Sequence, residues 1–97
     1  MNQVKFKQWK CNVKLHKYDD KYTSIKLTDV RDGSPIATAS IFVQTAQLCP
    51  GEVLIKEYSE NEGMLNALVK AKIVSDTGRC VQSGFVSIPV CKLLVTE

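Results

Sequence analysis

The chain has 97 residues, of which 44% are hydrophobic and 24% charged, and its formal net charge is +3. This length suits one domain with one core, residues 1–97, and the composition is that of an ordinary globular domain, which excludes a disordered chain. No run of residues approaches the roughly 18 consecutive apolar positions of a membrane span, and no apolar segment of a signal peptide follows the first lysines. We therefore expect no membrane partner and a cytoplasmic location.

Positive charge is concentrated near the N-terminus. Residues 1–26 hold seven lysines and two aspartates, whereas the remaining residues hold six basic and eight acidic side chains. A basic end of this kind indicates either an anionic partner or the solvated face of a sheet. The absence of arginine from residues 1–26 favours the solvated face, because arginine is the better ligand for phosphate.

Two strands are predicted first, from alternation of apolar and polar residues. In residues 9–18 and 22–30 the side chains expected to face inward are Trp9, Cys11, Val13, Leu15, Ile25 and Leu27. A period of two is typical of a half-buried strand with one wet face. Val4 and Phe6 fall on the opposite phase, so a bulge or break is expected near Gln8. Residues 18–21 are predicted to form the turn between the two strands.

Two further strands are predicted before the helix. Asp32-Gly33 is a strong turn signal, because glycine tolerates a positive φ. Residues 36–43 form the third predicted strand, and their small side chains favour close packing against a helix. A loop closed by Pro50-Gly51 leads to the fourth predicted strand, residues 52–58.

Residues 58–73 predict one amphipathic helix. Ser59 and Glu62 have the spacing of a capping box, in which each side chain accepts a hydrogen bond from the other residue's backbone N–H. Gly63 weakens the first turn by about 1 kcal/mol relative to alanine and could allow close packing on a strand. The predicted apolar stripe consists of Met64, Leu65, Leu68, Val69 and Ala71. A helix of about three turns is marginal alone, so we expect it to cover the sheet as the core plug.

The last third of the chain predicts a hairpin or two short strands, with a turn at residues 76–78. Pro89 favours an edge position or a strand break, because proline cannot donate a ladder hydrogen bond. Together these elements predict an α+β fold with a mostly antiparallel sheet, in the order β-β-β-β-α-β-β, and with the one amphipathic helix packed on the sheet.

The cysteines do not have the spacing of a metal site. Cys11, Cys49, Cys80 and Cys91 contain no C-x-x-C pair, and the single histidine, His16, lies near Cys11 only. Zinc ligands usually occur in close pairs, so no metal is expected. Without a secretion signal, Cys11 and Cys91 are predicted to be buried free thiols, because both fall on an apolar strand phase.

No catalytic motif is present. The sequence lacks the G-x-S-x-G nucleophile elbow and the glycine-rich phosphate loops. His16 and Cys11 are five residues apart, which places them on opposite faces of one strand, where they cannot pair as base and nucleophile. The adjacent carboxylates Asp19 and Asp20 lie in a predicted turn, where a structural role is usual. We therefore expect neither enzymatic activity nor a cofactor.

Several residues are candidates for binding. Those on the polar phase of the first two predicted strands are Lys10, Lys14, His16 and Lys26. With Tyr18 and Tyr22 beside them, they could form a platform for nucleic acid or a small anion. The sequence pI of about 8.7 favours a solvated face instead, because nucleic-acid-binding domains are usually more basic. Arg79 could join Lys14 and Lys26 in contacting phosphates, and the candidates for contacting a protein partner are Tyr58, Glu60 and Asn61.

Four segments resemble a known family: WKCNVKL, IKLTDVRDGSPIATA, VLIKEYSENEGMLNALVKAKIV and GFVSIPVCKLL. Together they cover nearly the whole chain, and YSENEGML at residues 58–65 is the most distinctive of them. The chain is similar to small uncharacterised phage and prophage proteins of about this length. The resemblance contributes no catalytic residues. It implies a short accessory gene product, and such products often inhibit host defence by blocking a host protein or by sequestering a nucleotide signal.

We therefore expect a small non-enzymatic binding protein of a phage or mobile element, acting in the cytoplasm of a bacterial host as a counter-defence inhibitor. Its partner would be a host protein or a small nucleotide. A nucleotide would need a pocket at a homo-oligomer interface, because one core of this size leaves little interior room. The alternative is a nucleic-acid-binding accessory protein that uses the lysine-rich face of the first two strands. A role in assembling the phage particle is a third hypothesis.

Overall fold

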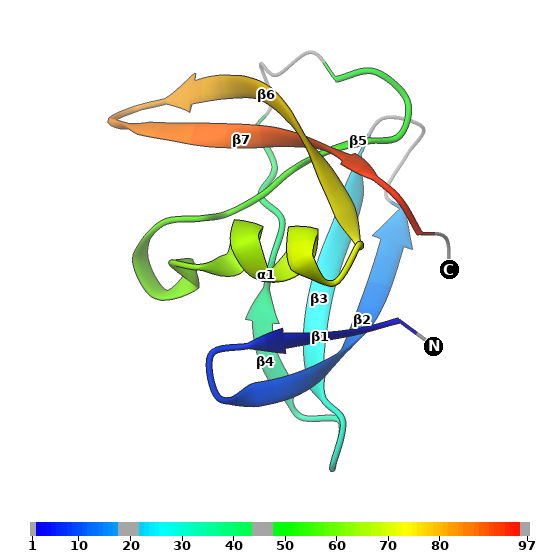
Figure 1. The fold of residues 1–97 in the computed structure, drawn as a ribbon. Helices are drawn as coiled ribbons and strands as arrows, with labels where there is room; N and C mark the ends of the chain where they lie inside the picture. The colour runs from blue at the N-terminus through cyan, green and yellow to red at the C-terminus, as the bar shows by residue number, and fades with distance from the viewer. Residues whose placement is uncertain (1, 18–21, 44–47, 96–97) are drawn as a thin grey trace.

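The protein is an α+β fold with two antiparallel sheets, as the computed structural model shows for residues 2–17, 22–43 and 48–95 (Figure 1). The predicted class and the helix packed on a sheet are confirmed. Five strands rather than four precede the helix, because residues 3–6 form a strand of their own. The predicted turn at residues 18–21 lies outside the described residues.

The N-terminal sheet is a four-stranded meander. Its strands, in spatial order, are β1 (Gln3–Phe6), β2 (Trp9–Lys17), β3 (Thr23–Asp29) and β4 (Pro35–Thr38). The predicted alternation is confirmed, since Cys11, Ile25 and Leu27 are fully buried. The break expected near Gln8 is a two-residue turn that pairs Phe6 with Trp9 and folds β1 back onto β2.

The C-terminal sheet has three strands in the order β5 (Glu52–Leu54), β7 (Val86–Leu93) and β6 (Val74–Ser83). The prediction for Pro89 was wrong, because this residue lies inside the central strand, β7. The Pro89 carbonyl accepts a hydrogen bond from the Ile55 N–H at 3.1 Å. The proline nitrogen points to the same side, and β5 ends at Leu54, so its missing hydrogen interrupts no ladder.

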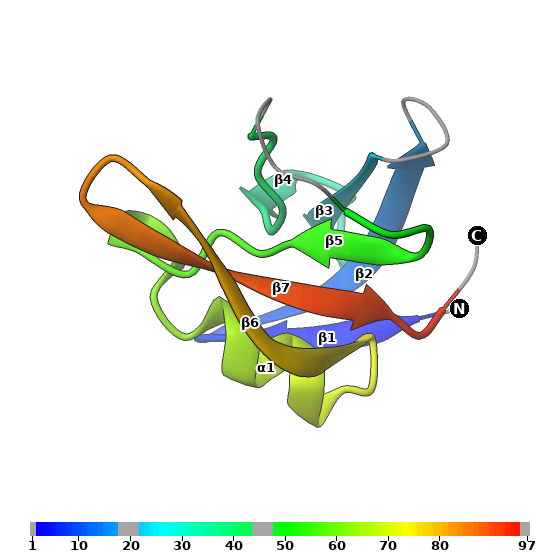
Figure 2. The same ribbon diagram turned by 90° about the horizontal axis from the view of Figure 1, so that it is seen from above.

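β6 and β7 form a hairpin, as predicted, but its turn is not at residues 76–78. β6 continues through that segment as a bulge, where the register shifts between Asp76 and Arg79 and Gly78 has a φ of 81°. The chain reverses at Gly84 and Phe85, between the paired residues Ser83 and Val86. This hairpin projects from the rest of the molecule (Figure 2).

The two sheets are joined on one side by backbone and on the other by the helix α1 (Met64–Lys70). The predicted third strand ends at Thr38, and the chain then crosses to the segment after β5. There the Lys56 N–H donates to the Ala39 carbonyl at 2.8 Å. On the opposite side, α1 contacts both β1 and β6. Met64 and Leu68 are fully buried in the main core cluster, so the helix is the core plug that its stripe predicted. Val69, also assigned to the stripe, is 39% exposed.

The predicted capping box does not form. A short 3-10 helix, η1 (Ser59–Asn61), precedes α1, and the Ser59 side chain makes no capping hydrogen bond. Glu57 takes that role instead, because its two carboxylate oxygens accept hydrogen bonds from the backbone N–H groups of Gly63, at 2.7 Å, and Leu65, at 2.5 Å. Gly63 has a φ of 94°, and a Cβ there would contact nothing within 4 Å. Gly63 therefore serves the backbone turn rather than close packing on a strand.

Two of the cysteines are buried thiols, as predicted. Burial raises the pKa of Cys91 to about 12, and it also raises the pKa of Cys11. Both thiols therefore stay protonated at neutral pH and pack as small apolar groups. Cys49 and Cys80 are exposed free thiols.

In the described part of the chain, no helix is both long enough and apolar enough to span a bilayer.

Candidate functional site

Four lysines share the outer face of the N-terminal sheet, and we call this set the lysine face: Lys5, Lys10, Lys14 and Lys26. All four are exposed. The register places Lys5 of β1 directly opposite Lys10 of β2, and Lys14 of β2 directly opposite Lys26 of β3. The two pairs lie on one strand phase, because residues 10 and 14 are four positions apart on β2, about 13 Å at 3.3 Å per residue.

The positive charge of the lysine face is not compensated by any acid in residues 2–17, 22–43 and 48–95. Like charges directly opposite each other on neighbouring strands destabilise a sheet. The only acid in the four strands is Asp29. Among the described residues, no ion pair involves a lysine of this face. Within the part of the chain that the structure describes, the sheet therefore holds two repulsive pairs with no carboxylate to offset them.

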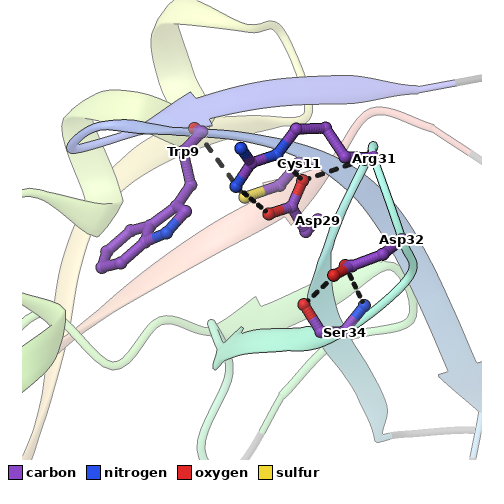
Figure 3. Close-up of polar contacts among 6 residues, drawn as sticks. All are labelled: Trp9, Cys11, Asp29, Arg31, Asp32 and Ser34. Atoms are coloured by element: carbon purple, nitrogen blue, oxygen red, sulfur yellow. Dashed lines mark hydrogen bonds and ion pairs between the residues drawn. The ribbon is translucent and has the colours of Figure 1, made fainter.

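Asp29 does not neutralise the lysine face, because its carboxylate is already paired with Arg31 (Figure 3). The Arg31 guanidinium donates to the Asp29 carboxylate from Nη2 at 2.9 Å and from Nε at 3.2 Å, and the Arg31 backbone N–H donates at 2.9 Å. These bonds from Arg31 lower the pKa of Asp29 below its ordinary value. In the following turn, Asp32 accepts hydrogen bonds from both the backbone and the hydroxyl of Ser34. Both carboxylates therefore hold the turn between β3 and β4.

The lysine face continues into a groove between β1 and α1, which we call the β1 groove. It has a volume of about 740 Å³. Its charged lining residues are all lysines: Lys5, Lys7, Lys10 and Lys70. The Lys7 ammonium donates to the Glu60 carbonyl at 2.9 Å, which fixes the side chain at one end of the groove. The basic surface thus runs from the sheet, around its β1 edge, to the helix.

A second opening, of about 610 Å³, lies near β4, and we call it the aromatic cleft. Its walls come from the β1–β2 turn, β4, the segment after β4, and η1. Trp9 and Phe42 line it, as do Thr38, Lys56 and Glu60. Thr38 is directly opposite Lys26 in the sheet, so the cleft adjoins the lysine face.

Of the residues predicted for binding, Lys10, Lys14 and Lys26 belong to the lysine face. His16 is exposed on the same phase of β2, directly opposite Ser24. Tyr22 packs edge-on against Phe42, with ring centroids 4.6 Å apart, whereas Tyr18 lies outside the described residues. The sheet thus brings together the N-terminal part of the predicted set.

The residues predicted at the helix start are held by internal contacts. Asn61 is 2% exposed, and its Nδ2 donates to the Thr38 carbonyl at 2.7 Å. Glu60 pairs with Lys56, whose hydrogen bond lowers the pKa of Glu60 to about 2. The Lys56 ammonium also lies 5.5 Å from the centre of the Tyr58 ring. Asn61 therefore anchors η1 to β4 and is not presented on the surface.

Arg79 lies apart from the lysine face. It belongs to β6 in the other sheet, and its guanidinium pairs with the carboxylate of Glu52 on β5. The backbone N–H of Cys49 and then the Arg79 guanidinium lower the pKa of Glu52. Arg79 is thus engaged within its own sheet, and the structure does not bring it together with Lys14 and Lys26.

Three members of the basic surface were absent from the predicted set: Lys5, Lys7 and Lys70. The signal for Lys5 was present in the sequence, since the phase break at Gln8 is the turn that pairs Lys5 with Lys10. Lys70 reaches the β1 groove only because α1 packs beside β1, and no local pattern encodes that contact.

Lys10→Glu should stabilise the fold by about 0.2–1 kcal/mol, a rise of a few degrees in Tm, because it replaces a repulsive cross-strand pair with an attractive one. The same substitution at Lys92 should act in the opposite direction, because Lys92 lies directly opposite Glu52. Thermal unfolding followed by circular dichroism measures both. Equal shifts in the two variants would show that cross-strand charge does not govern stability here.

No family model matches the chain, and no curated protein or solved structure matches it either. In the described part of the chain, no three residues among His, Cys, Asp and Glu are grouped as a metal site requires.

Proposed function

We propose that this chain is a non-enzymatic nucleic-acid-binding protein that contacts phosphates with its lysine face and β1 groove. The observation that supports this proposal most directly is the pairing of Lys5 with Lys10 and of Lys14 with Lys26 on one exposed face without an acid. A polyanion relieves the repulsion in both pairs at once. A solvated face would need no such arrangement, because alternating charges keep a sheet soluble at lower cost.

Phosphate contacts of this kind give affinity that is sensitive to salt and indifferent to sequence. Each lysine that neutralises a phosphate releases a counterion from the nucleic acid. If each of the four lysines of the lysine face contacts one phosphate, the slope of log K against log salt concentration on a single strand is about −2.8, at about −0.7 per contact. A lysine ammonium acts as a point charge toward the phosphate and does not read the base, so the contact is the same whatever the sequence.

The experiment is a titration of a fluorescein-labelled 20-nucleotide DNA strand followed by anisotropy between about 50 and 200 mM salt. The expected result is micromolar affinity at the lower salt concentration with a slope near −3, and similar affinity for strands of different sequence. Absence of binding at the lower salt concentration, or affinity that does not change with salt, would rule out this function.

The resemblance to phage proteins supports a second candidate, a contact inhibitor of a host protein. The observation that favours it is Phe85, which is 106% exposed in the turn between the paired residues Ser83 and Val86 of the β6–β7 hairpin. An aromatic side chain at a projecting tip is able to fill a pocket on a partner, as interface anchors do. The expected result is that native mass spectrometry detects a one-to-one complex with one host protein, which Phe85→Ser abolishes. Retention of the complex by Phe85→Ser would exclude the hairpin tip as the contact.

A further inference from the structure

We infer that the nucleic acid is single-stranded and that the aromatic cleft takes one of its unpaired bases. This inference rests on the proposed function and specifies its substrate. A base in a duplex must be unpaired and unstacked before it can enter such a cleft. The bases of a single strand are already unpaired and can stack on aromatic side chains.

The cleft lies where a strand bound to the lysine face would continue. Lys14, Lys26 and Thr38 are directly opposite one another across β2, β3 and β4, and Thr38 lines the cleft. Trp9 is on the opposite strand phase from Lys14 and faces the other side of the sheet, and β4 is the edge strand. A strand with its phosphates on Lys14 and Lys26 therefore passes round the β4 edge at Thr38 to bring its next base to the opening. We therefore assign the cleft to a base of the bound strand, because the positive charge of the adjoining lysine face attracts the phosphate backbone of that strand.

The walls of the cleft suit a base. Phe42 is 60% exposed, and Tyr22 supports it edge-on at an interplanar angle of 71°, so the Phe42 ring is both accessible and held in place. Trp9 is half-buried and lines the same cleft. Every base has a π-face, so stacking on these rings tolerates any sequence, as the lysine face does.

The polar groups of the cleft add hydrogen-bonding capacity, and none of them presents an unpaired negative charge. The Glu60 carboxylate is paired with the Lys56 ammonium, which removes its repulsion toward a nearby phosphate. The Lys7 ammonium lies at the rim, bound to the Glu60 carbonyl. The volume of about 610 Å³ falls within the range of roughly 300–1,000 Å³ that is usual for small organic ligands.

The test uses the one tryptophan of the chain, which belongs to the cleft. A dT20 strand should quench the fluorescence of Trp9, and a 20-base-pair duplex should not. Phe42→Ala should weaken dT20 binding about tenfold while leaving duplex binding unchanged. Phe85→Ala is the control, since it removes an even more exposed phenyl ring from the turn of the other sheet, and its affinity for dT20 should equal that of the wild type.

The possible outcomes separate this inference from the proposed function. Equal affinity for duplex and strand, with no effect of Phe42→Ala, would overturn the inference and leave phosphate binding by the lysine face intact. Binding of dTMP as tight as that of dT20 would also overturn it, because the cleft would then take a free nucleotide. If neither the strand nor the duplex binds, both this inference and the proposed function are wrong.

Discussion

Lys14→Gln combined with Lys26→Gln is expected to weaken binding of a 20-nucleotide strand on the order of tenfold to hundredfold at about 50 mM salt. These two lysines form the central repulsive pair of the lysine face, and they are exposed on adjacent strands. Glutamine keeps the polarity of the side chain and most of its length while removing the charge. The salt slope should therefore become shallower by about 1.4, which is the contribution of two single-strand phosphate contacts.

The control for this variant removes the same amount of charge elsewhere. Lys72 follows α1 and Lys92 lies on β7, and both are exposed. Lys72→Gln with Lys92→Gln should leave affinity within about twofold of the wild type, because neither residue belongs to the lysine face or the β1 groove. If both double variants lose affinity equally, net charge rather than the arrangement of these lysines determines binding.

Glu57→Ala is expected to lower the free energy of unfolding by about 1–2 kcal/mol, which corresponds to a fall of about 4–16 °C in Tm for a domain of this size. The Glu57 carboxylate accepts hydrogen bonds from the backbone N–H groups of Gly63 and Leu65, which α1 leaves without partners inside the helix. The loss reaches the core, because α1 carries the fully buried Met64 and Leu68.

Glu62→Ala is the informative control, because Glu62 is the residue that the capping-box pattern selects. Glu62 is exposed, and its carboxylate, unlike that of Glu57, does not cap α1. Its replacement should change the free energy of unfolding by less than about 0.5 kcal/mol. Thermal and urea unfolding measure both variants, and a larger loss for Glu62→Ala than for Glu57→Ala would contradict the observed cap.

The strands were predictable where one face is buried and the other wet. In β2 and β3, period-two alternation fixes which side chains face the core, so the sequence alone was enough to assign Lys10, Lys14 and Lys26 to one outer face. β1 was harder to recognise, because it has only four residues and its phase is opposite to that of β2. The phase reverses because a tight turn at Lys7 and Gln8 folds β1 back onto β2.

The helix cap and the position of Pro89 could not be predicted, because each depends on backbone geometry over several residues. A serine three residues before a glutamate favours a capping box, but Ser59 lies in η1 with a φ of 60°, and the turn at Gly63 brings Glu57 to the helix instead. Pro89 is acceptable in a central strand only because β5 stops opposite it. Neither the position of Glu57 at the helix start nor the end of β5 opposite Pro89 follows from the local sequence pattern.

Parts of the candidate site also depend on tertiary contacts. Asn61 looked available as a polar residue at a helix start, yet it is buried because η1 packs on β4. Arg79 has the chemistry of a phosphate ligand, but its sheet pairs it with Glu52. Phe42 had no pattern to distinguish it, and its importance comes from the cleft that two sequence-distant turns enclose with it.

The measurement that tests the lysine face most directly is a paired determination, on one preparation of Lys26→Glu, of Tm and of affinity for a 20-nucleotide strand. Lys26 lies directly opposite Lys14, so the new carboxylate should raise Tm by a few degrees. The same change places a negative charge among the phosphate contacts and should weaken binding by at least about tenfold. A more stable protein that no longer binds is the predicted result. A more stable protein with unchanged affinity would contradict a nucleic-acid role for this face.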